Sequence, residues 1–401
     1  MEEVKFGTVE KLSKLNFKAR DFRSLSKFDG ASPPSVFIGS GLKYPLVNVG
    51  ILSPVEKVDD ASVFDDPKNW AKDELSITDV LKLRENLLNS RFTSQVTDSR
   101  LNKRFTEISK EIALSQRPVS VEIELKSGVN VGSNPDRILT PNGMRAELKD
   151  VKIYEDVKID TKVDRAMNDE VKANEGINFL YSSGINEYSL SKILSVGVLG
   201  LKKDKKMVPT RWSITATDDI IAKELLKKVR SYQWIENYEF FSGEYLGNQY
   251  LIFLFPNVWS YELFELYYPG SSWNPGKDMK ASTDSEGYNG RTAYASNCGG
   301  GYYATRLPLL EYLDSIKRQA GVLVIRLETP SYWAGLGVWV VRESVRKSLG
   351  AEAMRFESKE ELLGDAMKIS KEKYDFDPKI IYERSTLLRL YGTQRNLNQW
   401  F

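Results

Sequence analysis

Residues 238–266, YEFFSGEYLGNQYLIFLFPNVWSYELFEL, decide the fold of this chain. Aromatic and aliphatic residues crowd into short runs in this stretch, and glycine and proline interrupt the runs. Such runs are typical of strands that are buried inside a sheet. We therefore predict that the stretch forms the central strands of a mixed sheet.

The sequence on either side predicts further strands and helices. Residues 33–54 carry Val, Ile and Leu runs between Gly and Pro, which predict buried strands and turns. Val119 to Leu125 alternates as a strand does, and Ser76-Ile-Thr-Asp79 resembles the start of a capped helix over Ile77 to Leu88. Further helices are expected near 99–115, 162–180, 189–194, 219–231, 305–319, 358–373 and 378–390, with another ending near 349 and a strand at 322–327.

These elements predict an α/β or α+β fold: a mixed central sheet with flanking helices, a smaller helical C-terminal part and a flexible C-terminal tail. Residues 269–301 are rich in Gly, Ser, Asn and Pro, which marks a boundary or an active-site loop. The predicted division is a charged arm (1–30), an N-terminal α/β domain (31–270), a C-terminal domain (271–390) and a tail (391–401).

Composition excludes several classes of chemistry. The 401 residues contain no histidine and one cysteine, Cys298, so a Cys/His zinc site, an internal disulfide and a Ser-His-Asp triad are ruled out. Whether the protein is an enzyme stays open, and its cofactors are unknown: no zinc is expected, and carboxylates could hold another divalent metal. The sequence has neither a signal peptide nor an apolar run of membrane-spanning length, so a cytoplasmic protein without membrane partners is expected.

The last eight residues, QRNLNQWF, have the spacing of a motif that binds the sliding clamp PCNA. In a 3₁₀ turn with three residues per turn, Gln394, Leu397 and Trp400 lie along one side, with Phe401 beside them. Burying two rings and a leucine contributes roughly 1.5–3 kcal/mol each, so transient docking near the micromolar range is expected. The alternative is a tail whose two aromatic residues pack on the protein's own core. Docking on PCNA would place the protein at the nucleoid.

Polar residues of the segments 208–219 and 284–306 predict a pocket for a nucleotide or phosphate. Residues 208–219, VPTRWSITATDD, are expected to place an arginine and a tryptophan on a strand before a helix. Gly299-Gly-Gly301 at a helix start exposes N–H groups to which anions bind, and arginines add fork-shaped contacts. The candidates are Arg211, Trp212, Asp218, Glu286, Arg291, Tyr303 and Arg306, with Tyr302 as a second stacking ring. The alternatives are that Thr217 or Asp218 caps a helix, that the loop is merely flexible, and that Cys298 is a passive side chain.

Two weaker patterns concern nucleic acid. Pro135-Asp136 followed by Glu147-Leu-Lys149 matches the PD-(D/E)xK pattern of metal-dependent nucleases, but the pattern is short and permissive, and PDRILTPNG is also typical of a turn between strands. The second pattern is a group of four lysines, Lys202, Lys203, Lys205 and Lys206. The group is either a patch that binds DNA phosphates or a solvated turn. Because the net charge is only +2, direct DNA binding would need such a local cluster.

Several segments together resemble the archaeal Nre (NreA-type) family of DNA-repair proteins. They are VFIGSGLKYPLVNVG (36–50), RFTSQVTDSRL (91–101), VPTRWSITATDD (208–219), EGYNGRTAYAS (286–296), GGGYYATRLPLLEYL (299–313), RQAGVLVIRLETPSYW (318–333) and GVWVVRESVRK (337–347). The resemblance implies a two-part protein that is recruited by the clamp and acts with nucleotide-excision factors. Many relatives also carry an N-terminal zinc-ribbon-like element, for which this chain lacks the ligands.

We therefore expect a DNA-repair factor recruited to PCNA, acting with nucleotide-excision repair proteins and binding nucleotide or nucleic acid in a polar pocket. The alternative is a non-catalytic adaptor that links repair enzymes to PCNA. A further alternative is a metal-dependent nuclease or phosphoesterase. An adaptor needs no convergent cluster, so the candidate pocket residues would then be scattered.

Overall fold

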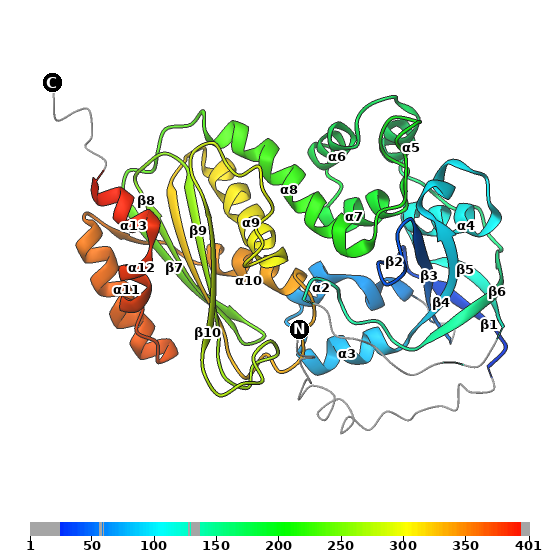
Figure 1. Ribbon diagram of the computed structural model, residues 1–401, viewed down its shortest axis with the longest axis horizontal. Helices are drawn as coiled ribbons and strands as arrows, with labels where there is room; N and C mark the ends of the chain where they lie inside the picture. The colour runs from blue at the N-terminus through cyan, green and yellow to red at the C-terminus, as the bar shows by residue number, and fades with distance from the viewer. Residues whose placement is uncertain (1–24, 56–57, 59, 127–128, 130–136, 394–401) are drawn as a thin grey trace. The chain divides into compact units, whose positions relative to one another are not determined.

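A computed structural model describes residues 25–55, 58, 60–126, 129 and 137–393. The described chain divides into two compact units, each with its own six-stranded sheet (Figure 1). Of the described residues, the N-terminal unit takes those between 25 and 221 together with 335–339, and the C-terminal unit takes 222–334 and 340–393. The predicted mixed α/β fold is confirmed, with a mixed sheet in each unit rather than a single central one.

The sheet of the N-terminal unit is antiparallel except where β4 and β6 run parallel. Its strands, in spatial order, are β1 (Lys27–Ser32), β5 (Val119–Leu125), β6 (Arg145–Ile153), β4 (Leu87–Gln95), β3 (Leu46–Pro54) and β2 (Val36–Gly39). The alternation predicted for Val119–Leu125 is confirmed, because Val119, Val121, Ile123 and Leu125 are buried and the residues between them are not.

Several helices of this unit begin at a residue whose side chain caps them. The helices of the unit are η2 (Ala61–Asp65), α2 (Pro67–Lys72), α3 (Ile77–Glu85), η3 (Val96–Arg100), α4 (Arg104–Leu114), α5 (Thr161–Asn168), α6 (Ala173–Ser182), α7 (Glu187–Ser195) and the first part of α8 (Thr210–Val229). The predicted capping box is confirmed at α3: the Ser76 hydroxyl accepts from the Asp79 N–H, and the Asp79 carboxylate accepts from the Ser76 N–H.

The strand predicted around Arg211 and Trp212 is wrong, since both residues lie in the first turn of α8. The β-branched residues of RWSITATDD favour a strand locally. Burial instead recurs at helical spacing, at Ser213, Thr217, Ile221 and Leu225. The amides of Trp212 and Ser213 both donate to the Pro209 carbonyl, so the helix begins directly after that proline.

The stretch 238–266 forms the middle of the C-terminal sheet, as predicted. The strands, in spatial order, are β10 (Lys280–Glu286), β9 (Ser260–Tyr267), β11 (Gly321–Glu328), β8 (Asn248–Phe255), β7 (Tyr238–Tyr245) and β12 (Met354–Phe356). Only β9 and β11 are parallel neighbours in this described sheet. The loop-rich segment 269–301 contains β10, and the boundary predicted at residue 270 falls just before that strand.

Helices cover both faces of the C-terminal sheet (Figure 1). One face packs an apolar core that includes Phe253, Phe264 and Ile325 against α11 (Lys359–Tyr374), α12 (Lys379–Arg384) and α13 (Thr386–Thr393). On the other face lies α9 (Gly300–Ile316), where the Tyr261 hydroxyl donates to the Tyr302 carbonyl. The remaining helix, α10 (Trp339–Leu349), begins at the end of the segment 335–339.

The two faces differ in chemistry because successive side chains of a strand point to opposite sides. On β9, Phe264 and Leu266 belong to the apolar core. Tyr261 and Glu265 point to the face that α9 covers. The second face therefore brings buried charged residues of β9, β10 and β11 together beneath one helix.

Candidate functional site

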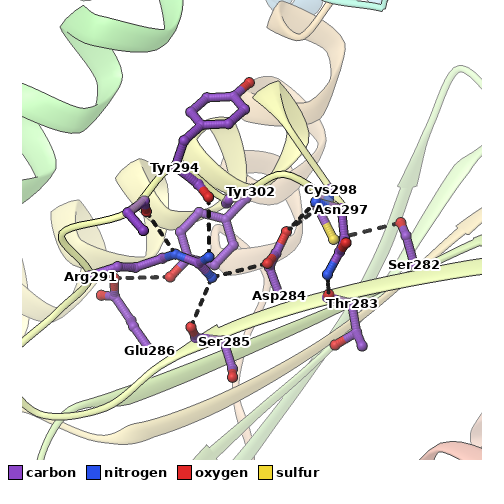
Figure 2. A network of polar contacts seen from close by, with 12 residues as sticks. Ser282, Thr283, Asp284, Ser285, Glu286, Arg291, Tyr294, Asn297, Cys298 and Tyr302 are labelled. Atoms are coloured by element: carbon purple, nitrogen blue, oxygen red, sulfur yellow. Dashed lines mark hydrogen bonds and ion pairs between the residues drawn. The ribbon is translucent and has the colours of Figure 1, made fainter.

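The candidate site is a buried polar network on the α9 face of the C-terminal sheet (Figure 2). It contains Glu265, Asp284, Glu286, Arg291, Tyr302, Arg306, Arg326 and Glu328. Antiparallel pairing sets Asp284 opposite Leu263 and Glu286 opposite Tyr261, so both acidic residues of β10 face the helix. All of these residues except Arg291 are buried.

Asp284 binds the turn that leads into α9. Its Oδ2 accepts from the N–H groups of Asn297 and Cys298 at 2.9 and 2.8 Å, and the Asn297 amide donates to the Thr283 carbonyl at 2.9 Å (Figure 2). The sequence predicts that an anion binds at this glycine-rich helix start. At Asn297 and Cys298 that anion is the chain's own Asp284 carboxylate.

Arg291 joins the loop before α9 to the same carboxylate. Its Nη1 lies 3.0 Å from Asp284 Oδ1, and its guanidinium also donates to the carbonyls of Ser285, Ala293 and Tyr294 (Figure 2). Burial disfavours the charged guanidinium, but Asp284, Tyr302 and Tyr303 together outweigh it, and the pKa of Arg291 is raised. The arginine therefore holds the loop in a fixed conformation.

Glu286 and Arg306 form a fully buried ion pair. Arg306 Nε donates to Glu286 Oε1 at 2.8 Å, and the Trp259 indole donates to the same oxygen at 2.9 Å. The Tyr302 hydroxyl donates to Oε2 at 2.9 Å. Burial, and then the negative charge of Glu286, raise the pKa of the Tyr302 hydroxyl well above its ordinary value. Tyr302 is consequently a hydrogen-bond donor here and not a base.

Arg326 lies between two buried carboxylates, at 2.5 Å from Glu265 and 3.0 Å from Glu328. Burial raises the pKa of Glu328 to about 7, despite the nearby arginine. A Cβ atom on Gly301 would lie 2.4 Å from Glu265 Oε1, so only glycine lets the start of α9 approach this carboxylate.

The network as a whole pairs charge with charge inside the protein. Asp284 is paired with Arg291, Glu286 with Arg306, and Arg326 with Glu265 and Glu328. Such an arrangement orders the loop 287–299 and the start of α9.

The predicted pocket residues divide between the two units. Glu286, Arg291, Tyr303 and Arg306 come together in the C-terminal unit, whereas Arg211, Trp212 and Asp218 belong to the N-terminal unit. Trp212 is 51% exposed, and Asp218 and Thr217 are buried within α8 rather than at its start, where a cap would lie. That all seven residues form one ligand pocket stays a prediction.

The exposed rings near the network are not the predicted ones. Tyr302 and Tyr303 are buried, and the Tyr303 hydroxyl accepts from the Ala295 N–H. Tyr288 and Tyr294 are 41% and 54% exposed. Tyr294 stacks on Tyr303, and the Arg230 guanidinium lies 4.4 Å from the centroid of the Tyr288 ring. Tyr288 and Tyr294 are more accessible to a base than Tyr302 and Tyr303 are. Both lie in the loop EGYNGRTAYAS, whose tyrosines the sequence analysis did not select as candidates.

Cys298 is buried, and burial raises the pKa of its thiol, with the negative charge of Glu265 acting in the same direction. A thiol of raised pKa is a poor nucleophile. Among the described residues, no three carboxylate or thiol groups are placed to hold a metal ion.

The nuclease pattern is described only in part, because Pro135 and Asp136 lie outside the described residues. Glu147 and Lys149 both lie on β6. Lys126 binds Glu147 at 2.5 Å and Lys149 binds Glu124 at 2.6 Å, so each of these two motif residues is engaged in an ion pair across neighbouring strands.

The lysine patch is smaller than the sequence indicates. Lys205 is half-buried and donates to the Met167 carbonyl at 2.7 Å, and burial lowers the pKa of its amine. Lys202, Lys203 and Lys206 are exposed. The clamp-motif residues Gln394, Leu397, Trp400 and Phe401 lie outside the described residues, directly after α13.

Comparison with known sequences gives the family. The model of the archaeal Nre N-terminal domain matches residues 5–274, and that of the archaeal Nre C-terminal domain matches residues 286–400. The chain belongs to the archaeal Nre family. The two family domains meet near the boundary predicted at residue 270, whereas the compact units divide within α8.

Curated relatives match over most of their length. The chain is 36% identical to the DNA repair protein NreA of Haloferax volcanii, over 92% of this chain and 88% of that protein. It is 38% identical to the DNA repair protein NreA of Archaeoglobus fulgidus, over 84% of each, and 34% identical to the DNA repair protein NreB of the same organism, over 92% and 90%. No solved structure matches the chain. None of the described helices has the length and apolar character needed to cross a membrane.

Proposed function

We propose that this Nre-family chain is a DNA-repair factor, recruited to the sliding clamp PCNA by its C-terminal residues and acting with nucleotide-excision repair proteins. The observation that carries the repair role is similarity to DNA repair proteins over nearly their whole length. The excision-repair partners follow from what resemblance to the family implies.

Two observations support recruitment through the tail. Gln394, Leu397, Trp400 and Phe401 have the spacing that puts an amide and three apolar side chains on one side of a short turn. The match to the C-terminal family domain runs to residue 400, so the region shared with the family includes three of these four residues.

The paired charges of the polar network favour an adaptor over a hydrolase in the C-terminal unit. A hydrolase would keep a carboxylate or a nucleophile ready for substrate or metal. Here the carboxylates bind the chain's own arginines, and the cysteine is buried with a raised pKa. The network would then stabilise the unit from which the clamp-binding tail extends.

Removing Trp400 and Phe401 by truncation after Gln399 should weaken PCNA binding at least about tenfold, because the two rings supply most of the docking area. Isothermal titration calorimetry with the purified clamp measures this. The control replaces Asn396 and Asn398 by alanine, which leaves all four motif residues in place. Unchanged affinity of the truncated protein, or a large loss of its thermal stability, would show that the tail packs on its own protein instead.

A further inference from the structure

A second polar site lies in the N-terminal unit, where strands β4 and β6 run side by side. A pocket of about 250 Å³ opens there, and Asn48, Arg91, Thr93, Arg145 and Glu147 contribute to its lining. Part of its lining therefore comes from polar and charged side chains of three adjacent strands, β3, β4 and β6.

The register of the sheet brings the two arginines together. Asn89 is the partner of Arg145 and Arg91 is the partner of Glu147 on the parallel strands β4 and β6. Asn48 is the partner of Thr93 on β3 and β4. Because residues two apart share a face, Arg91 and Arg145 are diagonal neighbours on the same side of the sheet.

The two positive charges are not balanced within the described residues. Arg91 is half-buried, and its Nε is buried without a hydrogen-bond partner in the described part of the chain. Its guanidinium lies 5.4 Å from the Phe37 ring centroid, and burial followed by repulsion from Arg145 lowers its pKa. The facing carboxylate, Glu147, is bound by Lys126 at 2.5 Å. Two adjacent guanidinium groups in this setting favour an anion between them.

A buried amide beside the pocket also lacks partners. Asn89 is 0% exposed, and neither its Oδ1 nor its Nδ2 has a hydrogen-bond partner among the described residues. A Cβ atom on Gly50 would lie 1.9 Å from Asn89 Oδ1, so the glycine on β3 makes room for this amide on the arginine face. Unpartnered buried amides are costly, which is typical of a site that binds a ligand or an ordered water.

We propose that the β4–β6 pocket binds a phosphate group, held between the guanidinium groups of Arg91 and Arg145. Arginine forks match phosphate oxygens, and Thr93 and Asn48 add neutral hydrogen-bonding groups. The pocket is smaller than typical ligand cavities of about 300–1,000 Å³, so it suits one phosphate group with a small part of the molecule that carries it. The molecule that carries this phosphate is either a DNA strand, at its end, or a free mononucleotide.

The test measures binding of inorganic phosphate, of a mononucleotide, and of a short single strand with and without a 5′ phosphate, by calorimetry on the full chain. We expect inorganic phosphate to bind and to raise the unfolding temperature. Replacing Arg91 or Arg145 by glutamine should weaken phosphate binding roughly tenfold or more. Preference for the phosphorylated strand over its unphosphorylated form identifies a DNA end as the source, and tighter binding of the mononucleotide identifies the free ligand.

Matched variants separate ligand binding from folding. Arg165→Gln removes an arginine of the same unit that is 71% exposed, and it should leave phosphate binding unchanged. Arg91→Lys keeps the charge but loses the fork, and it should fold normally yet bind phosphate more weakly. Phosphate that neither binds nor stabilises the wild-type chain at millimolar concentration overturns the proposal, as does equal stabilisation of the wild type and the Arg145→Gln variant. Neither result bears on clamp docking, which uses other residues.

Discussion

Two partly buried carboxyl groups of the N-terminal unit show how neighbours decide the charge of a residue. Burial opposes the charge of Asp65, yet Lys192 and Arg84 at 2.7 and 2.6 Å lower its pKa. Glu85, at the end of α3, has a buried Oε2 with no hydrogen-bond partner in the described chain, and burial raises its pKa to about 7. Asp65 therefore stabilises the fold as an anion, whereas Glu85 destabilises it once it is ionised.

Replacing Glu85 by glutamine should stabilise the protein near pH 8 by roughly 1 kcal/mol, a value reduced for the solvent that reaches this side chain. The folded pKa of about 7 lies above the ordinary 4.5, so the folded state keeps a proton that the unfolded state loses. The free energy of unfolding therefore falls as pH rises from 4.5 to 7, and the variant lacks this fall. Urea unfolding at both ends of this range measures the difference, with the exposed Glu170→Gln as control. An equal effect at both pH values would contradict the assignment.

At the scale of elements, a single carboxylate on β9 holds the start of the last helix. Glu262 is buried, and its oxygens accept from the Ser385 hydroxyl and from the N–H groups of Thr386 and Leu387 at 2.5, 3.1 and 3.0 Å. A negative charge at a helix start satisfies N–H groups that have no partner within the helix. Glu262 thereby anchors the helix that directly precedes residues 394–401.

Glu262→Gln should loosen α13 by about 2 kcal/mol, which corresponds to roughly thirtyfold faster amide exchange in that helix. The glutamine side chain keeps one acceptor oxygen, but it lacks the negative charge of Glu262. Its N–H₂ group would face the Ser385 hydroxyl and the N–H groups of α13, which are themselves donors. Hydrogen exchange read by mass spectrometry measures this, and Glu383→Gln, at an exposed residue of α12, is the control. Exchange that rises equally in α11 would indicate general destabilisation, and unchanged exchange in α13 would exclude the anchoring role.

At the scale of the whole molecule, charge is nearly balanced, with a net value of +2. A protein of this charge has no general attraction for DNA, so any direct contact depends on a local group of cations. In the turn before α8, Lys202, Lys203 and Lys206 are exposed and Lys205 is not. The candidate group that binds DNA phosphates therefore contains three lysines instead of four.

Reversing two of these charges, with Lys203→Glu and Lys206→Glu, should weaken DNA binding to all sequences alike and make its dependence on salt shallower. Phosphate contacts release counterions and read no bases, so sequence preference should not change. Fluorescence anisotropy across a salt series measures both effects. The control makes the same net change with Lys277→Glu and Lys280→Glu, which are exposed in the other unit. If the unmodified protein does not bind DNA even at low salt, recruitment rests on the clamp and partner proteins, as for an adaptor.

Local patterns in the sequence determined the most apolar strands and most of the helices, whereas the strands β1, β4, β6, β10 and β12 were not predicted. The apolar stretch 238–266, the alternation of Val119–Leu125 and the Ser76 capping box are each settled by residues close in sequence, because burial period and capping are local properties. The resemblance to the Nre family was likewise carried by short segments. The start of α8 was not predictable in this way, since its β-branched residues favour a strand while their helical spacing fits a buried helix face.

Only the tertiary structure decided which charged residues meet. Glu286 and Arg306 are 20 positions apart and Arg326 and Glu265 are 61 apart, and the register of β9, β10 and β11 beneath α9 pairs them. The pairing of β10 with β9 also sets Asp284 against the N–H groups of Asn297 and Cys298, and in the other sheet the register of β4 and β6 places Arg91 beside Arg145. Pairing of buried charges depends on the three-dimensional distance between side chains, and a one-dimensional pattern of residue types does not contain that distance.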